Sequence, residues 1–158
     1  MMNRKLTIIR EAISGFLSLI LTITGNAQNI HRVACNGDID KLDSMLLSTD
    51  LHIPDNRGRS LLHWAVGCNQ KAVMNYLINK GIEINLEDND GYTSLYIAVQ
   101  FARTELFDTL VSLQPNDNWK QLYGASMLER AILNQNLSFV QRLVEVGVPI
   151  DIVYDRGS

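Results

Sequence analysis

Hydrophobic and polar positions repeat along this chain with a period of 33 residues. Three kinds of residue keep this step, and they are Gly58, Gly91, Gly124 and Gly157, then Leu62, Leu95 and Leu128, then Ala65, Ala98 and Ala131. Many positions hold one period without an insertion, which chance does not produce. The pattern therefore indicates an array of structural repeats, each too small to bury its apolar face alone.

Each period predicts a pair of helices. Ser60, Thr93 and Ser126 carry hydroxyl groups that can cap a helix N-terminus, and the glycine two residues earlier suits a turn with positive φ. Apolar residues at helical spacing follow, then a polar break near residue 69 and a second apolar helix over 73–78. Glycine terminates that helix at Gly81 and Gly147. The polar link over 82–91 predicts a projecting hairpin.

A further copy lies upstream, one residue out of step. Residues 30–34 (IHRVA) stand 32 residues before residues 62–66 (LHWAV). A turn follows at residues 36–38, and the apolar positions between 39 and 46 then predict a second helix. The array therefore starts near residue 29.

These residues resemble the ankyrin-repeat family. Residues 55–65 (DNRGRSLLHWA) are similar to its D-x-x-G-x-T-P-L-H-x-A signature, as are residues 88–98 (DNDGYTSLYIA) and, more weakly, residues 121–131 (QLYGASMLERA). The resemblance implies an all-α repeat solenoid of stacked helix-turn-helix units with projecting β-hairpin loops. It implies one domain over 28–158, with repeats at about 29–54, 55–87, 88–120 and 121–153 and the start of a further hairpin at 154–158.

Three departures affect the turns. The family proline after Ser/Thr is replaced by Leu61, Ser94 and Met127, Gln114-Pro115 stands where other repeats have glycine, and Gln121 replaces aspartate. The second helix of the third repeat is expected to end differently, and the turn geometry over 114–124 stays open.

The resemblance implies that hairpin tips and first helices line one concave binding face. The residues that its register places there, and that we predict to contact a partner, are Asn56, Arg57, Arg59, Asn89, Asp90, Tyr92, Phe101 and Tyr123. The three aromatic residues suit a binding hot spot. Alternatively, Phe101 folds back onto Phe107, the tyrosines cover the hairpins, and Arg57 and Arg59 pair with the aspartates at 88 and 90.

Structural roles are expected for the signature residues His63, Gly58, Gly91 and Gly124. In the family the histidine supports the turn through hydrogen bonds, and we expect His63, with His31 at the matching place, to do so rather than bind a metal. Spacings typical of zinc sites, phosphate loops or a nucleophile elbow are missing from the sequence. We therefore predict a non-catalytic protein without a cofactor or metal.

The N-terminal segment predicts export. Basic residues up to Arg10 precede an uncharged run over 12–24 and a Gly-Asn-Ala sequence, which together are typical of a secretory signal peptide over 1–27, cleaved after Ala27. The alternative is a membrane anchor through 12–24, although that run falls short of the roughly 20 residues that cross a bilayer. The mature protein would be secreted or periplasmic, and the compact signal favours a bacterial source.

Charge excludes some partners. Residues 1–27 carry three basic side chains and one acidic side chain, so their removal takes the net charge from −3 to −5. An acidic chain with 7% aromatic residues is a poor candidate for nucleic-acid or anionic membrane binding. The remaining hypotheses are a scaffold for another protein, a dedicated inhibitor or immunity protein for one enzyme, and, with least support, an enzyme or small-ligand binder. One tight enzyme partner would favour the inhibitor.

Two expectations concern the cysteines and the last repeat. Stacked helices lie about 8–10 Å apart, farther than the roughly 7 Å that a disulfide allows between Cα atoms, which favours free or buried thiols for Cys35 and Cys68 unless the one-residue offset brings them together. The last repeat keeps an apolar face, so we expect that the array continues beyond 158 or that this repeat packs on a partner or a second copy. A strictly monomeric species at high concentration that binds no apolar dye would count against this.

Overall fold

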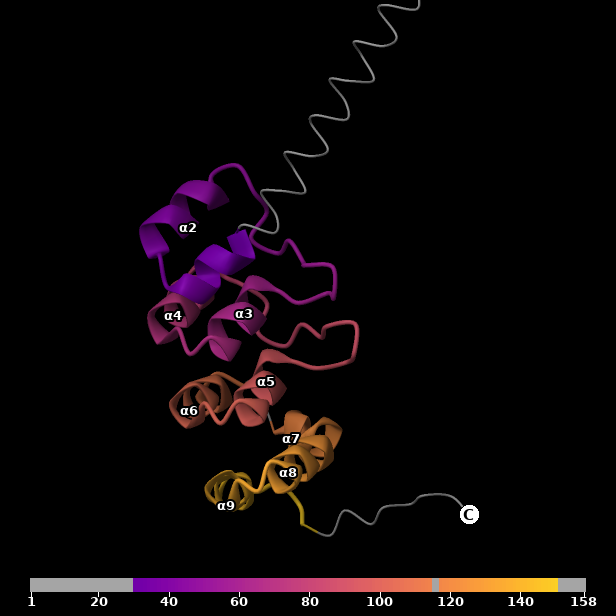
Figure 1. The fold of residues 1–158 in the computed structure, drawn as a ribbon. Coiled ribbons are helices and arrows are strands. Elements are labelled where there is room, and N and C mark those ends of the chain that lie inside the picture. Colours follow the sequence, from indigo (N-terminus) through magenta and orange to yellow (C-terminus); the bar gives the residue numbers. More distant parts are fainter. Residues whose placement is uncertain (1–29, 115–116, 151–158) are drawn as a thin grey trace, which may run out of the picture.

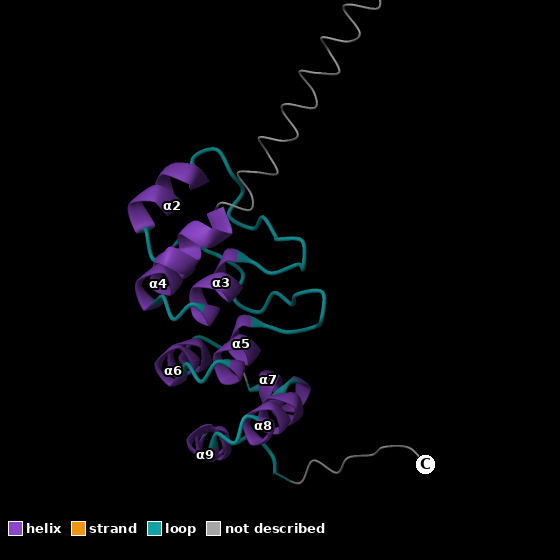
Figure 2. Cartoon of the chain, in the orientation of Figure 1, coloured by secondary structure: helices purple, strands orange, loops and turns teal. Residues whose placement is uncertain are grey.

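The computed structural model describes residues 30–114 and 117–150, which form a single-file stack of helix pairs (Figure 1). A helix over residues 30–36 comes first, followed by α2 (Ile39–Leu46), α3 (Leu61–Gly67), α4 (Lys71–Asn79), α5 (Ser94–Gln100), α6 (Thr104–Ser112), α7 (Asn118–Leu122), α8 (Gly124–Leu133) and α9 (Leu137–Glu145). The first helices α3, α5 and α8 form one column, and the second helices α4, α6 and α9 form another (Figure 2). The prediction of an all-α repeat solenoid is confirmed.

Two long loops, over residues 47–60 and 80–93, project from one side of the stack (Figure 1). They occupy the places of the predicted hairpins and contain turns and bends without a strand. Gly58 and Gly91 have φ values of 76° and 78°, which glycine adopts without strain. The amide of Asn89 donates to the carbonyl of Arg57 at 2.9 Å, so neighbouring hairpins are joined through their backbones.

Hydroxyl side chains cap α3 and α5. Ser60 Oγ accepts from the amide of His63 at 3.5 Å, and Thr93 Oγ1 accepts from the amide of Tyr96 at 3.4 Å. Each bond satisfies an amide that the first helical turn leaves without a backbone partner. The capping positions predicted for these two helices are therefore the observed ones.

The turn between the two helices of a repeat has the same backbone conformation in every described repeat. The residues at that place have positive φ, and they are Gly37 (83°), Asn69 (61°), Ala102 (54°) and Gln135 (55°). In three repeats, the residue that follows donates its amide to the alanine carbonyl five residues back, at 2.8–2.9 Å. The left-handed turn thus closes the first helix and starts the second.

The fourth repeat departs from the pattern. Over 114–124, where the sequence left the turn geometry open, the short helix α7 precedes α8, and Gly124 is the first residue of α8 instead of a positive-φ turn residue. The predicted cap at Ser126 is wrong, because this residue lies within α8 and its hydroxyl donates to the carbonyl of Tyr123. Gly124 has a different constraint: a Cβ there would lie 2.8 Å from Cγ1 of buried Val148.

The C-terminal ends of the second helices agree with the sequence prediction more closely than the start of the fourth repeat does. Gly81 and Gly147, with φ of 87° and 88°, terminate α4 and α9 as predicted. The second helix of the third repeat, α6, ends at Ser112 without glycine. An aromatic cluster then joins the third and fourth repeats, because the Phe107 ring meets those of Trp119 and Phe139 edge-on at 6.0 and 5.1 Å.

Ion pairs connect successive second helices. Lys80 Nζ lies 2.9 Å from Asp43 Oδ1, and Arg142 Nε lies 2.8 Å from Asp108 Oδ1. Lys71 pairs with Glu105 in the same way between α4 and α6. Because all of these side chains are at least partly exposed to solvent, each pair contributes little to stability. The pairs mark the register of the stack more than they stabilise it.

A disulfide joins the first two repeats, so the expectation of free or buried thiols is wrong. Cys35 and Cys68 are bonded, with their Cα atoms 5.2 Å apart. Cys35 lies near the end of helix 30–36 and Cys68 is the C-cap of α3, so the one-residue offset brings these two helix ends closer than the helix axes. The side chain of Gln70 adds a hydrogen bond to the Cys35 carbonyl at 2.9 Å.

The predicted signal peptide over 1–27 and the start of a further hairpin at 154–158 lie outside the described residues. Within residues 30–114 and 117–150, no helix is long and apolar enough to cross a membrane.

The left-handed turns generate a stability prediction. Ala102 has φ of 54°, a conformation that costs an L-residue about 1–2 kcal/mol and costs glycine little. Ala102→Gly is therefore expected to raise the free energy of unfolding by about 1 kcal/mol, measured by urea denaturation. The matched control is Ala72→Gly on the exposed side of α4, which should lower it by about 0.5–1 kcal/mol. Equal effects of the two variants would show that the turn at Ala102 is not strained.

Candidate hairpin-face binding site

His63 ties the start of α3 to the next hairpin. Its Nδ1 accepts from the amide of Ser60 at 3.1 Å, so the proton lies on Nε2, which donates to the carbonyl of Tyr92 at 2.9 Å. His31 Nε2 lies 3.2 Å from the carbonyl of Ile53 in the first repeat. Burial lowers the pKa of His63 below its ordinary value, which favours the neutral ring that this pattern requires.

Asp55 organises the first hairpin. Its carboxylate accepts from the amides of Arg57 and Arg59 at 2.8 and 2.9 Å, and from Trp64 Nε1 at 3.0 Å. It also pairs with the Arg59 guanidinium at 2.7 Å. Burial raises the pKa of Asp55, but the hydrogen bonds from Arg59, Arg57 and Trp64 outweigh this and hold the pKa below its ordinary value.

The alternative in which arginines pair with aspartates of the next hairpin is therefore wrong for Arg59, whose partner belongs to its own hairpin. The Arg59 guanidinium also lies 4.4 Å from the centroid of the Trp64 ring. Among the residues that the structure describes, Arg57 forms no ion pair with either Asp88 or Asp90. The Arg57 side chain is exposed, as are those of Asn56, Asn89 and Asp90.

A pocket of about 310 Å³ opens between α3 and α5. It is mainly apolar, and its lining residues are Arg59, His63, Trp64, Gly67, Cys68, Ile97 and Phe101. Gly67 lines it without a side chain, and a Cβ there would lie in van der Waals contact with Ile97 Cγ2 at 3.5 Å, so a larger side chain at this position would extend into the pocket. Phe101 is 49% exposed at the rim. A bulky apolar side chain from a partner fits a pocket of this kind.

The alternative position for Phe101, folded onto Phe107, is wrong. The Phe107 side chain is fully buried against Trp119 and Phe139, whereas Phe101 lies at the pocket between the second and third repeats. Phe101 is the C-cap of α5, and it lines the pocket together with Gly67 and Cys68 at the end of α3.

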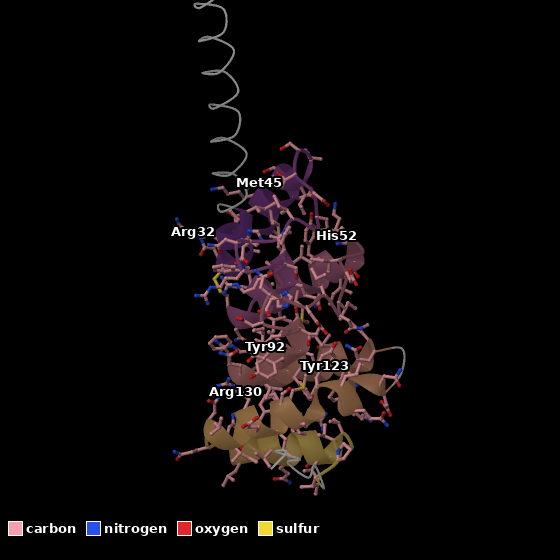
Figure 3. All side chains as sticks on the ribbon, turned by 90° about the vertical axis from the view of Figure 1, so that its right-hand side faces the viewer. Arg32, Met45, His52, Tyr92, Tyr123 and Arg130 are labelled. Carbon is pink, nitrogen blue, oxygen red and sulfur yellow. A yellow bond between two sulfur atoms is a disulfide. The ribbon has the colours of Figure 1, made fainter. Side chains whose placement is uncertain are left out.

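The tyrosines take up positions along the same side of the stack (Figure 3). Tyr92 is half-buried and stacks on Tyr96 with ring centroids 4.0 Å apart, beside a second, smaller pocket of about 180 Å³ that Arg130 also lines. Tyr123 is half-buried and donates to Glu87 of the preceding hairpin, and this hydrogen bond raises its pKa. We call the surface formed by the loops over 47–60 and 80–93 and by the exposed sides of the helix over 30–36, α3, α5 and α8 the hairpin face.

Sequence reasoning missed four residues of the hairpin face. They occupy one position of successive first helices, and they are Arg32, Trp64, Ile97 and Arg130. The repeat period could have found them, since each stands 32 or 33 residues after the last. The family register pointed to hairpin tips and helix ends, whereas these four residues lie within their helices.

The last repeat leaves apolar side chains exposed. On α8 and α9 and beyond them, these include Ile132 (58%), Leu137 (80%) and Ile150 (68%). This is the surface on which a further repeat or another molecule was expected to pack.

Comparison with known proteins identifies the family. A sequence model of the family described as ankyrin repeats (3 copies) matches residues 30–121, more than half of the chain. The chain therefore belongs to the ankyrin-repeat family. Ankyrin repeats generally mediate protein–protein interaction, and proteins built from them are typically non-catalytic scaffolds.

Three relatives illustrate how widely the repeat occurs. Ankyrin repeat domain-containing protein OPG023 of Cowpox virus (strain Brighton Red) is 36% identical over 67 residues, covering 42% of this chain and 10% of that protein. Ankyrin repeat protein 14 of Vaccinia virus (strain Western Reserve) has the same identity over 67 residues, 28% of its length. Neurogenic locus notch homolog protein 1 of Xenopus tropicalis is 31% identical over 106 residues, 66% of this chain and 4% of that protein. This chain spans less than a third of each relative.

The buried histidine predicts a pH-dependent stability. Because the folded-state pKa of His63 lies below the ordinary value of about 6.5, the unfolded chain takes up a proton before the folded chain does. The free energy of unfolding should therefore be at its full value above about pH 6.5 and decrease as the pH falls towards the lowered folded-state pKa. Urea denaturation between pH 7.5 and 5 measures this slope.

Two variants isolate the contribution of His63. His63→Gln should be less stable than the wild type at pH 7.5 but lose less stability on acidification. His52→Gln, at an exposed loop histidine, should keep the wild-type slope. A His63→Gln protein with an unchanged slope would show that another group causes the decrease.

Proposed function

We propose that this protein is an exported, non-catalytic binding module that takes a partner protein on its hairpin face. The observation that carries the proposal is the apolar pocket between α3 and α5, with Phe101 half-exposed at its rim and Trp64 in its wall. Exposed aromatic residues beside a pocket are typical of the few contacts that dominate protein binding. Two of the residues predicted to contact the partner, Arg59 and Phe101, line this pocket.

Export is the second part of the proposal. The Cys35–Cys68 disulfide supports it, because such bonds persist in oxidising spaces outside the cytosol. The charged start and apolar run over 12–24 are consistent with a cleaved signal peptide, and their compact length favours a bacterial periplasm or exterior. Anchoring to a membrane through 12–24 is the alternative.

Intact mass of the protein recovered from its source tests the export proposal. We expect a mass that begins at Gln28, with no alkylation of the two cysteines before reduction and alkylation of both after it. A chain that begins at Met1 and is recovered from membranes would replace the secreted protein with an anchored one. Cysteines that alkylate without reduction would argue against an oxidising compartment.

Site-specific photo-crosslinking tests the binding face. The protein carries p-benzoylphenylalanine in place of Phe101, or, as the matched control, in place of the exposed Asn75 on α4. Irradiation with the secreted and envelope fractions of the source should give discrete products at position 101 that are absent at position 75. A single enzyme crosslinked in one-to-one ratio would favour a dedicated inhibitor or protective protein. Identical products at both positions, or none at position 101, would contradict the proposed face.

A further inference from the structure

The repeat register builds a stripe of defined chemistry across the hairpin face. One position of the successive first helices holds Arg32, Trp64, Ile97 and Arg130, so the stripe reads basic, aromatic, aliphatic, basic. Helices in such a stack lie about 8–10 Å apart, so the stripe is about 25–30 Å long, which an extended segment of about eight residues spans. Figure 3 shows Arg32 and Arg130 towards the same edge of the stack, with Tyr92 at an intermediate height.

The centre of the stripe is the apolar pocket. Trp64 and Ile97 form two of its walls, and Gly67 leaves space that any larger side chain would fill. Trp64 is held by its hydrogen bond to Asp55 and by the Arg59 guanidinium above its ring, so it is fixed before a partner arrives. A preorganised wall reduces the entropic cost of binding.

The two arginines at the ends of the stripe form no ion pair with a carboxylate of the described residues. In the described part of the chain, the cations that pair with carboxylates are Arg59, Lys71, Lys80, Lys120 and Arg142. Arg32 and Arg130 form no such pair with any described residue, although the chain as a whole is acidic. Arg130 is instead held by Tyr96, to whose hydroxyl its Nε donates at 2.9 Å.

Acidic groups of the hairpin face do not neutralise these arginines, and the exposed Asp90 forms no ion pair with any described residue. Asp55 is taken up by Arg59, and Glu129 lines the smaller pocket beside Arg130 without forming an ion pair with it. Arg103 donates from Nη2 to the Gly67 carbonyl at 3.3 Å, and it adds a cation next to the central pocket that pairs with no carboxylate of the described ranges.

We propose that the partner is recognised through an extended acidic segment of about eight residues with a bulky apolar side chain near its middle. The apolar side chain enters the pocket between α3 and α5, and carboxylates on either side of it meet Arg32 and Arg130. This inference rests on the proposed function and specifies the partner's chemistry.

Selection from a random 12-residue peptide library displayed on phage, against the purified disulfide-bonded protein, tests the inference. Enriched sequences should share a bulky apolar residue flanked by aspartate or glutamate. The consensus peptide is then synthesised and its Kd measured by fluorescence polarisation. Charge-assisted contacts of about 1.5 kcal/mol predict that Arg32→Glu weakens binding about tenfold, and that added salt weakens it further.

Two further variants separate the contribution of the apolar pocket to binding from the effect of a change in charge. Gly67→Leu should abolish binding of the consensus peptide by filling the pocket, while Lys41→Glu, an equal charge change on exposed α2, should leave the Kd unchanged. Arg32 is exposed, so loss of binding in Arg32→Glu would not reflect unfolding, and circular dichroism checks each variant.

Enriched peptides without acidic residues, a Kd insensitive to Arg32→Glu, or no enrichment at all would overturn the acidic-segment inference. Crosslinking at position 101 would still report whether the hairpin face binds a protein, so failure of the inference and failure of the proposed function remain distinguishable.

Discussion

The structure depends on contacts between neighbouring repeats, because no helix pair in this chain can bury its apolar face alone. The His63 ring shows the same dependence at the level of one side chain: Ser60 orients it within its own repeat, and it donates to Tyr92 of the next. The amide of Asn89 and the carbonyl of Arg57 connect the two hairpins again. Each repeat is therefore stabilised by its neighbours, and these hydrogen bonds hold the hairpins at a fixed spacing.

The two sides of the stack use charge differently. Between the second helices, cations such as Lys80 and Arg142 meet carboxylates of the preceding repeat and help to set the register. On the hairpin face, Arg32 and Arg130 pair with no carboxylate among the residues described, and they stand at the two ends of a stripe whose central residues, Trp64 and Ile97, line an apolar pocket. A guanidinium that forms no ion pair within the protein is available to a carboxylate of a partner, which makes these residues candidates for recognition.

The fold was predictable from the sequence and the candidate site only partly. Three predicted features do not depend on tertiary contacts, and the structure shows each of them. They are the repeat period, the helix caps at Ser60 and Thr93, and the terminating glycines at 81 and 147. The link before α8 was not predictable in detail, because α7 is held by burial of Trp119 against Phe107, a contact between repeats. Phe101 is exposed, as one of its two predicted positions required. The other position, folded onto Phe107, is wrong because Phe107 is buried in the contacts between repeats.

The sequence by itself determined the class of fold. The 33-residue period, the helical spacing of apolar residues and the capping residues can all be recognised in the order of residues along the chain, without knowledge of tertiary contacts. Tertiary structure alone decided the Cys35–Cys68 bond, the pairing of Arg59 with Asp55 and the pocket beside Gly67. Each of these depends on distances of a few ångströms between side chains, and such distances are fixed only when the repeats stack. A one-residue offset was enough to bring two helix ends within reach of a disulfide that the average helix spacing disfavours.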